Sequence, residues 1–214
     1  MKALLYKQFR LVCHPMTVVF CFFGVMLLIP SYPYTVSFFY VTLGLFFTFT
    51  NQREQRDLYY MAILPVRKRD AVKGAVLFVC LIELAGMVLS IPFAILSSRI
   101  NPVGGNAVGL DANVALFAAG LLIYAVFNGV FLPALYQSGY KVGTAYLKAI
   151  IPTTLVIAVC EASAHIPELL WLNDTAAAGN IRQLPLLFGA LILYIAALVL
   201  AYRTAAKRYE KVDL

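Results

Sequence analysis

The sequence NQREQRDLYYMAILPVRKRDAVK, residues 51–73, determines how the chain is organised. It holds six basic and three acidic residues, and strongly apolar segments flank it on both sides. A charged hairpin between two membrane spans must lie in water, and its excess of positive charge indicates the cytoplasmic side. The hairpin is too long for a simple turn and too short for a domain. We therefore interpret residues 51–73 as a docking element for a cytoplasmic partner.

The composition predicts an all-α integral membrane protein with a single transmembrane domain over residues 1–214. The chain is 62% hydrophobic and 13% charged, whereas soluble proteins are about 45–50% apolar and about 25% charged. The net charge of +7 lies at the ends of the apolar segments, so we attribute it to membrane topology and expect no nucleic-acid partner. The four cysteines form no C-x-x-C pair and have no histidine at metal-ligand spacing, so no metal site is predicted.

Six apolar segments predict six transmembrane helices. Residues 1–14 are amphipathic and predict an interfacial helix that turns into the bilayer at Pro15. Residues 137–148 form a second cytoplasmic loop, and residues 167–184 lie flat in the outer interface or form a short re-entrant helix. The expected spans are Met16–Ile29, Tyr34–Thr50, Gly74–Leu96, Val114–Tyr136, Ala149–Ile166 and Pro185–Tyr202.

The basic residues orient this topology. Fifteen of the seventeen Lys and Arg residues fall in segments that six spans place on one side, and only Arg99 and Arg182 fall on the other. Since Lys and Arg accumulate in cytoplasmic loops, both termini are expected in the cytoplasm.

Within the hairpin, the pattern predicts a helix, a break and a second helix. Leu64 precedes Pro65 and is pushed away from helical angles, and a new helix can begin at Pro65 and continue through Lys73. The alternative is a solvated loop with interfacial tyrosines. The expected face of the first helix consists of Gln55, Leu58, Tyr59 and Ala62.

Four polar residues inside the predicted spans need an explanation. Glu83, Asn128 and Glu161 lie within apolar segments, and His165 follows Glu161 by four residues, so these last two side chains can share a proton or a hydrogen bond. Buried carboxylates are costly and usually face the bundle interior. They either line a polar pathway or proton relay, or are protonated, hydrogen-bonded packing residues.

No catalytic motif is present. The sequence has no G-x-x-x-x-G-K-[ST] phosphate loop, no H-E-x-x-H and no G-x-S-x-G. We therefore expect no catalytic residue and no cofactor in this chain, and a transport subunit rather than an enzyme.

The run LYYMAILPVRKRDAVKGAVL resembles the first cytoplasmic loop of type-2 ABC transporter permeases. LPALYQSGYKVGTAYLKAIIP is similar to the second cytoplasmic loop of that family. Arg67 and Lys68 depart from the pattern, because many relatives have Ser or Thr there as a helix cap. The matching residues are Glu54, Asp57, Leu64, Pro65, Val66, Arg69, Val72 and Lys73 in the first loop, and Leu132, Pro133, Gly139, Lys141 and Gly143 in the second.

This resemblance implies a small bacterial exporter subunit in the plasma membrane. In such transporters the first loop carries a coupling helix that sits in a groove of a separate ATPase subunit, which holds ATP and Mg²⁺. Two permease chains, identical or different, assemble with two ATPase chains, and small members often export peptides, including amphipathic antimicrobial ones. The residues expected to dock on the ATPase are Glu54, Asp57, Leu58, Tyr59, Leu64, Pro65, Arg69 and Lys73. The residues singled out in the second cytoplasmic loop are Gly139, Lys141 and Gly143.

Two other functions fit the same sequence. Glu83 and Glu161 could serve a proton-coupled secondary transporter. The chain could also be a membrane-embedded immunity or scaffold protein without transport activity.

Overall fold

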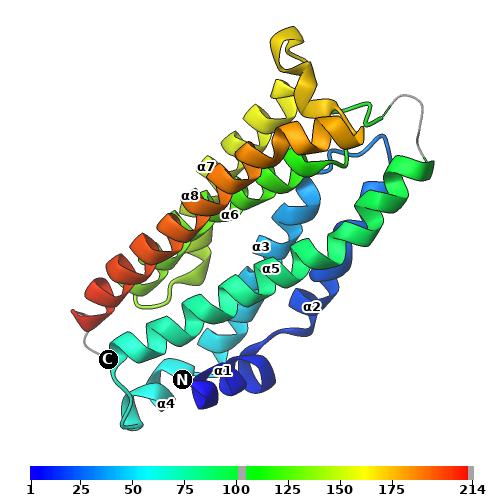
Figure 1. The fold of residues 1–214 in the computed structure, drawn as a ribbon. Helices are drawn as coiled ribbons and strands as arrows, with labels where there is room; N and C mark the ends of the chain where they lie inside the picture. The colour runs from blue at the N-terminus through cyan, green and yellow to red at the C-terminus, as the bar shows by residue number, and fades with distance from the viewer. Residues whose placement is uncertain (101–104, 212–214) are drawn as a thin grey trace.

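A computed structural model describes residues 1–100 and 105–211, except for the side chains of Leu58 and Ala62. These residues form helices joined by short connections, with no strand among them (Figure 1). The helices are α1 (Lys2–Lys7), η1 (Gln8–Val12), α2 (Pro15–Cys21), η2 (Phe22–Leu28), α3 (Val36–Glu54), α4 (Asp57–Ile63), α5 (Lys68–Ile100), α6 (Val114–Gln137), α7 (Val142–Ser163), η3 (Pro167–Asn173) and α8 (Ala177–Glu210).

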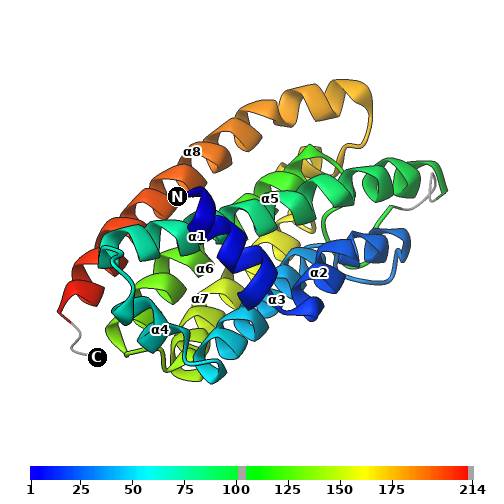
Figure 2. The ribbon, with the colours of Figure 1, turned by 90° about the horizontal axis from the view of Figure 1, so that it is seen from below.

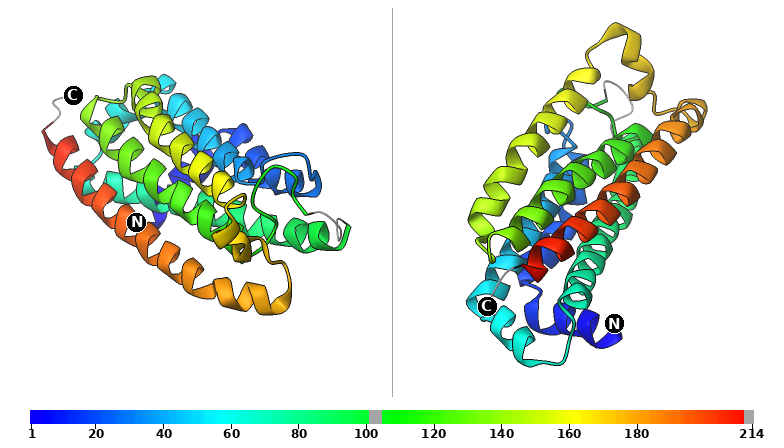
Figure 3. Two further views of the ribbon diagram at one scale, coloured as in Figure 1. Left: turned by 90° about the horizontal axis from the view of Figure 1, so that it is seen from above. Right: turned by 90° about the vertical axis from the view of Figure 1, so that its left-hand side faces the viewer.

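The long helices form two layers. Helices α6, α7 and α8 lie on one side of the bundle, and α2, α3 and α5 lie on the other (Figure 3). Helix α6 has no charged residue and is buried along most of its length, against α7 and α8 and against α3. Aromatic side chains fill the space between the layers, where Phe49 of α3 meets Phe131 of α6 edge to face at 5.4 Å between ring centroids.

The N-terminal segment bends sharply where the sequence predicts it. Helices α1 and η1 meet α2 and η2 at 96°, and the His14 side chain accepts a hydrogen bond from Met16 N at the start of α2 (3.2 Å). Thr17 Oγ1 then donates to the Gly44 carbonyl of α3 at 2.6 Å. A Cβ at Gly44 would lie 2.9 Å from the Thr17 Cα, so only glycine permits this approach.

The two ends of the bundle differ in what they carry. Helix α1, helix α4 and the last turn of α8 gather at one end, which we call the α4 end (Figures 1 and 2). There Arg69, at the start of α5, makes an ion pair with Glu210 at the end of α8. The opposite end, which we call the η3 end, carries η3 and the loop of residues 105–113.

Among the described residues, four helices are long and apolar enough to cross a membrane, namely α5, α6, α7 and α8, and the bent N-terminal pair makes a fifth if it counts as one span. The last turn of helix α3 consists of the polar residues 51–54. Its apolar part is therefore shorter than a full membrane span. The described chain is therefore a multi-pass helical membrane protein, while six spans remain a prediction.

Several helices are longer than the predicted membrane spans. Helix α7 begins at Val142, so most of the predicted second cytoplasmic loop, residues 137–148, is helical and the turn itself is residues 138–141. Helices α5 and α8 likewise extend beyond their predicted spans at both ends. The physical reason is that a helix continues into water while its backbone hydrogen bonds and one packed face persist, whereas the apolar run ends at the bilayer edge. Residues 167–184 hold a short helix, η3, followed by the first turns of α8.

Candidate functional site

The hairpin of residues 51–73 folds as the helix, break and helix that its sequence predicts. Arg56 takes a left-handed conformation (φ 53°) that ends α3 and starts α4, and Leu64 is extended (ψ 147°) before Pro65. The second helix begins at Lys68 and not at Pro65. The intervening residues form a tight turn, in which Val66 N donates to the Leu64 carbonyl at 2.7 Å. Because of this turn, the second helix begins three residues after Pro65.

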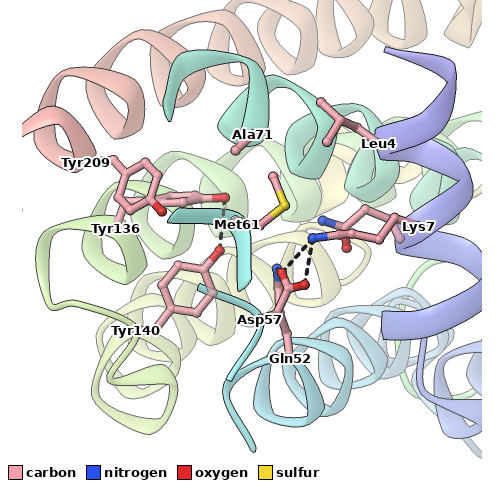
Figure 4. Close-up of a pocket in the computed structure, with 10 residues that line it drawn as sticks. Leu4, Lys7, Gln52, Asp57, Met61, Ala71, Tyr136, Tyr140 and Tyr209 are labelled. Carbon is pink, nitrogen blue, oxygen red and sulfur yellow. Dashed lines mark hydrogen bonds and ion pairs between the residues drawn. The ribbon is translucent and has the colours of Figure 1, made fainter. Parts of the chain in front are cut away.

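Asp57 faces into the protein. Its carboxylate accepts two hydrogen bonds from Lys7 Nζ, at 2.8 and 2.7 Å, and one from Gln52 Nε2 at 2.6 Å (Figure 4). Lys7 belongs to α1 and Gln52 to α3, so one carboxylate joins three helices. In this chain the Asp57 side chain is buried and hydrogen-bonded within the bundle, and its role in docking stays a prediction.

Three tyrosines complete the wall of this cluster. Tyr136 and Tyr140, at the end of α6 and in the following turn, and Tyr209 of α8 line the same small cavity as Lys7 and Asp57, with a volume of about 10 Å³ (Figure 4). Tyr140 Oη donates to Tyr136 Oη at 3.2 Å. Burial raises the pKa of Tyr140 well above its ordinary value, so this hydroxyl remains a neutral donor. The α6–α7 turn and the end of α8 thus pack beside α4.

The outward face of α4 is apolar, aromatic and open. Tyr59 and Tyr60 are each 62% exposed and Ile63 is 83% exposed. Leu64 and Pro65 continue this surface, and the Leu58 side chain lies outside the described residues. Exposed aromatic and aliphatic side chains in one patch are typical of a protein contact. Tyr59, Leu64 and Pro65 therefore lie on the exposed surface, and their role in docking stays a prediction.

A groove runs from this patch towards the N-terminus. It encloses about 720 Å³ between α1, α4 and the start of α5. Its apolar walls come from Leu4, Tyr60 and Met61, and Arg67 and Asp70 stand at its edge. Tyr60, Leu64 and Pro65 also line this groove, so the patch and the groove adjoin each other at the α4 end.

The other charged residues of the hairpin have different surroundings. Glu54 and Lys73 are exposed. Arg69 is exposed as well, but its Nε donates to Glu210 Oε1 at 2.5 Å and its Nη2 to Glu210 Oε2 at 3.1 Å. Arg69 therefore joins the start of α5 to the end of α8 and does not point freely towards a partner.

The second predicted loop is a four-residue turn. Gly139 (φ 59°) and Tyr140 (φ 66°) are both left-handed, a conformation that favours glycine. Lys141 is exposed beside it, and Gly143 lies in the first turn of α7 with open space where a Cβ would stand. These residues lie at the α4 end and leave the outer side of the turn accessible.

Glu83 lies at the centre of the bundle and is fully buried. Its carboxylate accepts hydrogen bonds from Asn128 Nδ2 at 3.0 and 2.8 Å, and from Tyr194 Oη at 2.8 Å. The residues come from α5, α6 and α8, so this cluster fastens the two layers together. The expectation that Glu83 and Asn128 face the interior is confirmed, and their geometry is that of a packed hydrogen-bonded cluster.

Glu161 and His165 do not pair with each other in the described residues. Glu161 accepts hydrogen bonds from the backbone N–H of Thr35 at 3.1 Å and of Leu110 at 2.9 Å, and also from the Thr35 hydroxyl. His165 Nε2 donates to the Val108 carbonyl at 2.8 Å. Both side chains fix the 105–113 loop at the η3 end, so the predicted shared proton is wrong.

Sequence reasoning missed Lys7, Gln52 and the three tyrosines. The partners of Asp57 come from 50 residues upstream and from the preceding helix, and a single sequence carries no signal for such a pairing. Within the described residues no group of three His, Cys, Asp or Glu side chains could hold a metal ion.

The Glu83 cluster predicts how two substitutions differ. Glu83→Gln should leave the thermal unfolding midpoint in detergent nearly unchanged, because the new amide can donate to Asn128 Oδ1, which has no hydrogen-bond partner. Glu83→Leu should lower the midpoint by several degrees, because it leaves two buried polar groups unpaired at about 1–3 kcal/mol each. An equal loss in both variants would show that Glu83 has a role that needs its charge.

Comparison with known proteins identifies the family. A family model described as ABC-2 family transporter protein matches residues 3–210. Neither the comparison with curated proteins nor the comparison with solved structures finds a match. The match extends from α1 to the last residue of α8, and so includes the hairpin with α4, the Glu83 cluster and the second turn. The chain therefore belongs to the ABC-2 transporter family of membrane proteins, in which it is a permease subunit.

Proposed function

We propose that this chain is the membrane subunit of an ATP-driven exporter and that α4 docks on a separate ATPase subunit. The observation that carries the proposal is the two-sided character of α4. Its inner face is fixed by Asp57, and its outer face presents Tyr59, Tyr60 and Ile63 to solvent. The family match supports an ABC ATPase as the partner.

In this proposal the chemistry and the transport occur in different chains. ATP and Mg²⁺ bind in the ATPase subunit, and two permease chains, identical or different, assemble with two ATPase chains. The contacts of Asp57 support a route by which motion passes from the ATPase to the spans. A displacement of α4 would move α1 through Lys7 and α3 through Gln52. The groove beside α4 adds surface for the same partner.

The proposed cargo is a peptide or another amphipathic, antimicrobial compound. This rests on the resemblance to small bacterial exporters, and no described side chain selects a cargo. A proton relay through Glu83 receives less support, because Glu83 is enclosed by Asn128 and Tyr194 and Glu161 is engaged with the backbone of the 105–113 loop.

We further propose six spans in a bacterial plasma membrane, with both termini and the α4 end in the cytoplasm. The α4 end carries the basic residues Lys7, Arg67, Lys68, Arg69, Lys141, Lys207 and Arg208. The positive-inside rule favours the cytoplasm for that end.

A double substitution on the outer face of α4 tests the docking proposal. Tyr59→Asp with Ile63→Asp should lower ATP hydrolysis by the complex purified from the native host at least about tenfold, because the substitutions place charge in a desolvated contact. ATP-dependent uptake of a labelled amphipathic peptide into inside-out vesicles should fall in parallel. The unfolding midpoint of the permease should remain that of the wild type, because both side chains are exposed.

The matched control is Ile166→Asp with Leu170→Asp, which replaces two exposed apolar side chains at the η3 end. This control should keep ATP hydrolysis. If both double variants retain hydrolysis and transport, α4 is not the docking element.

Orientation is tested by labelling in a variant whose four cysteines are replaced. Thr175→Cys at the η3 end and Lys2→Cys in α1 are both exposed positions. A membrane-impermeant maleimide added to intact cells should label residue 175 at once and residue 2 only after permeabilisation. Labelling of residue 2 in intact cells would contradict a cytoplasmic N-terminus.

A further inference from the structure

A second groove at the α4 end carries a concentration of positive charge. It lies where the end of α8 approaches the start of α5 and encloses about 510 Å³. Its lining includes Arg203 and Lys207 from α8 and Lys211, which follows α8 directly. The single acidic residue in it, Glu210, is engaged by Arg69. Among the described residues, Arg203, Lys207 and Lys211 make no ion pair, so this groove keeps a net positive charge.

The basic side chains continue an exposed apolar stripe on the same face of α8. Ile192, Ala196 and Leu200 are exposed and follow one another at four-residue steps. Arg203 and Lys207 extend this row by three and four residues, so they lie on the same helix face. At about 1.5 Å per residue, Arg203 stands roughly 5 Å beyond Leu200 along the helix axis, and Lys207 about 10 Å beyond it.

Tyr202 lies where the apolar stripe ends and the basic residues begin. It lines the groove between the apolar stripe and the bases, and tyrosines gather at the boundary between the hydrocarbon core and the headgroups. In a bilayer, this order of residues would place the groove at headgroup level and the apolar stripe in the hydrocarbon.

We propose that this groove binds the phosphate of an anionic phospholipid, with the acyl chains along Ile192 and Leu200. Arg203 and Lys207 would hold the phosphate, since basic pockets between helices at this depth bind anionic headgroups. The ion pair between Arg69 and Glu210 keeps the two helix ends together and so maintains the groove. A free phosphate offers the same charge but nothing for the apolar stripe.

Native mass spectrometry of the chain in a neutral detergent tests this site. The probe is phosphatidylglycerol offered together with an equal amount of phosphatidylcholine. The wild type should retain phosphatidylglycerol in preference, and Arg203→Gln with Lys207→Gln should weaken its retention about thirtyfold, at about 1 kcal/mol for each base removed. Lys141→Gln with Lys148→Gln is the matched control. It also removes two exposed bases, one just before α7 and one within it.

Three outcomes decide the proposal. Selective loss in the α8 variant, with retention in the α7 control, supports the site. Equal loss in both variants would overturn it, because bulk charge alone would then explain the binding. Displacement of the lipid by an equal concentration of inorganic phosphate would also overturn it, because the acyl chains would then contribute nothing. Thermal unfolding in the neutral detergent shows that each variant is folded.

Discussion

A carboxylate buried at the end of a helical bundle needs partners, and Asp57 finds them on two other helices. Lys7 supplies an opposite charge from α1, and Gln52 supplies a hydrogen bond from α3. Without these partners the charge would cost several kcal/mol to bury. The seven-residue helix α4 is therefore held in one orientation, although a helix of this length is not stable alone.

The rest of the α4 end depends on this orientation. With Asp57 directed inwards, Tyr59 and Ile63 face solvent, because they lie on the other side of the same short helix. The groove beside α1 depends on the same contact, because Lys7 of α1 pairs with Asp57 of α4. The exposed surface of α4 and its attachment to the bundle thus follow from one buried charge.

The same rule governs the interior. Glu83 is satisfied by Asn128 and Tyr194 from two other helices, and Glu161 by backbone groups of neighbouring segments. In each case a polar group surrounded by apolar structure joins elements that are distant in sequence, because an unpaired polar group there would be costly. The Glu83 carboxylate therefore joins the two layers, and the Glu161 carboxylate joins segments at the η3 end.

Much of this fold could be predicted from apolar runs and a few breakers. The bend at Pro15, the break at Leu64 and Pro65, and the full extent of α6 all follow from local preferences. The orientation of α4 could not be predicted. A helix of two turns has too few residues for its hydrophobic pattern to show which side faces the bundle. The partners of Asp57, Glu83 and Glu161 depend on tertiary packing, and helix ends in water leave no hydropathy signal.

The central claim is that the contact between Lys7 and Asp57 fixes α4 against α1. Pulsed electron spin resonance between labels at the exposed positions of Tyr6 and Tyr60 measures this directly, in a variant whose native cysteines are replaced. We expect a narrow distance distribution that broadens in Asp57→Asn and becomes narrow again in the exchanged pair Lys7→Asp with Asp57→Lys, where the unpartnered Gln52 Oε1 can accept from the new lysine. A distribution that is the same in all three proteins would contradict the account.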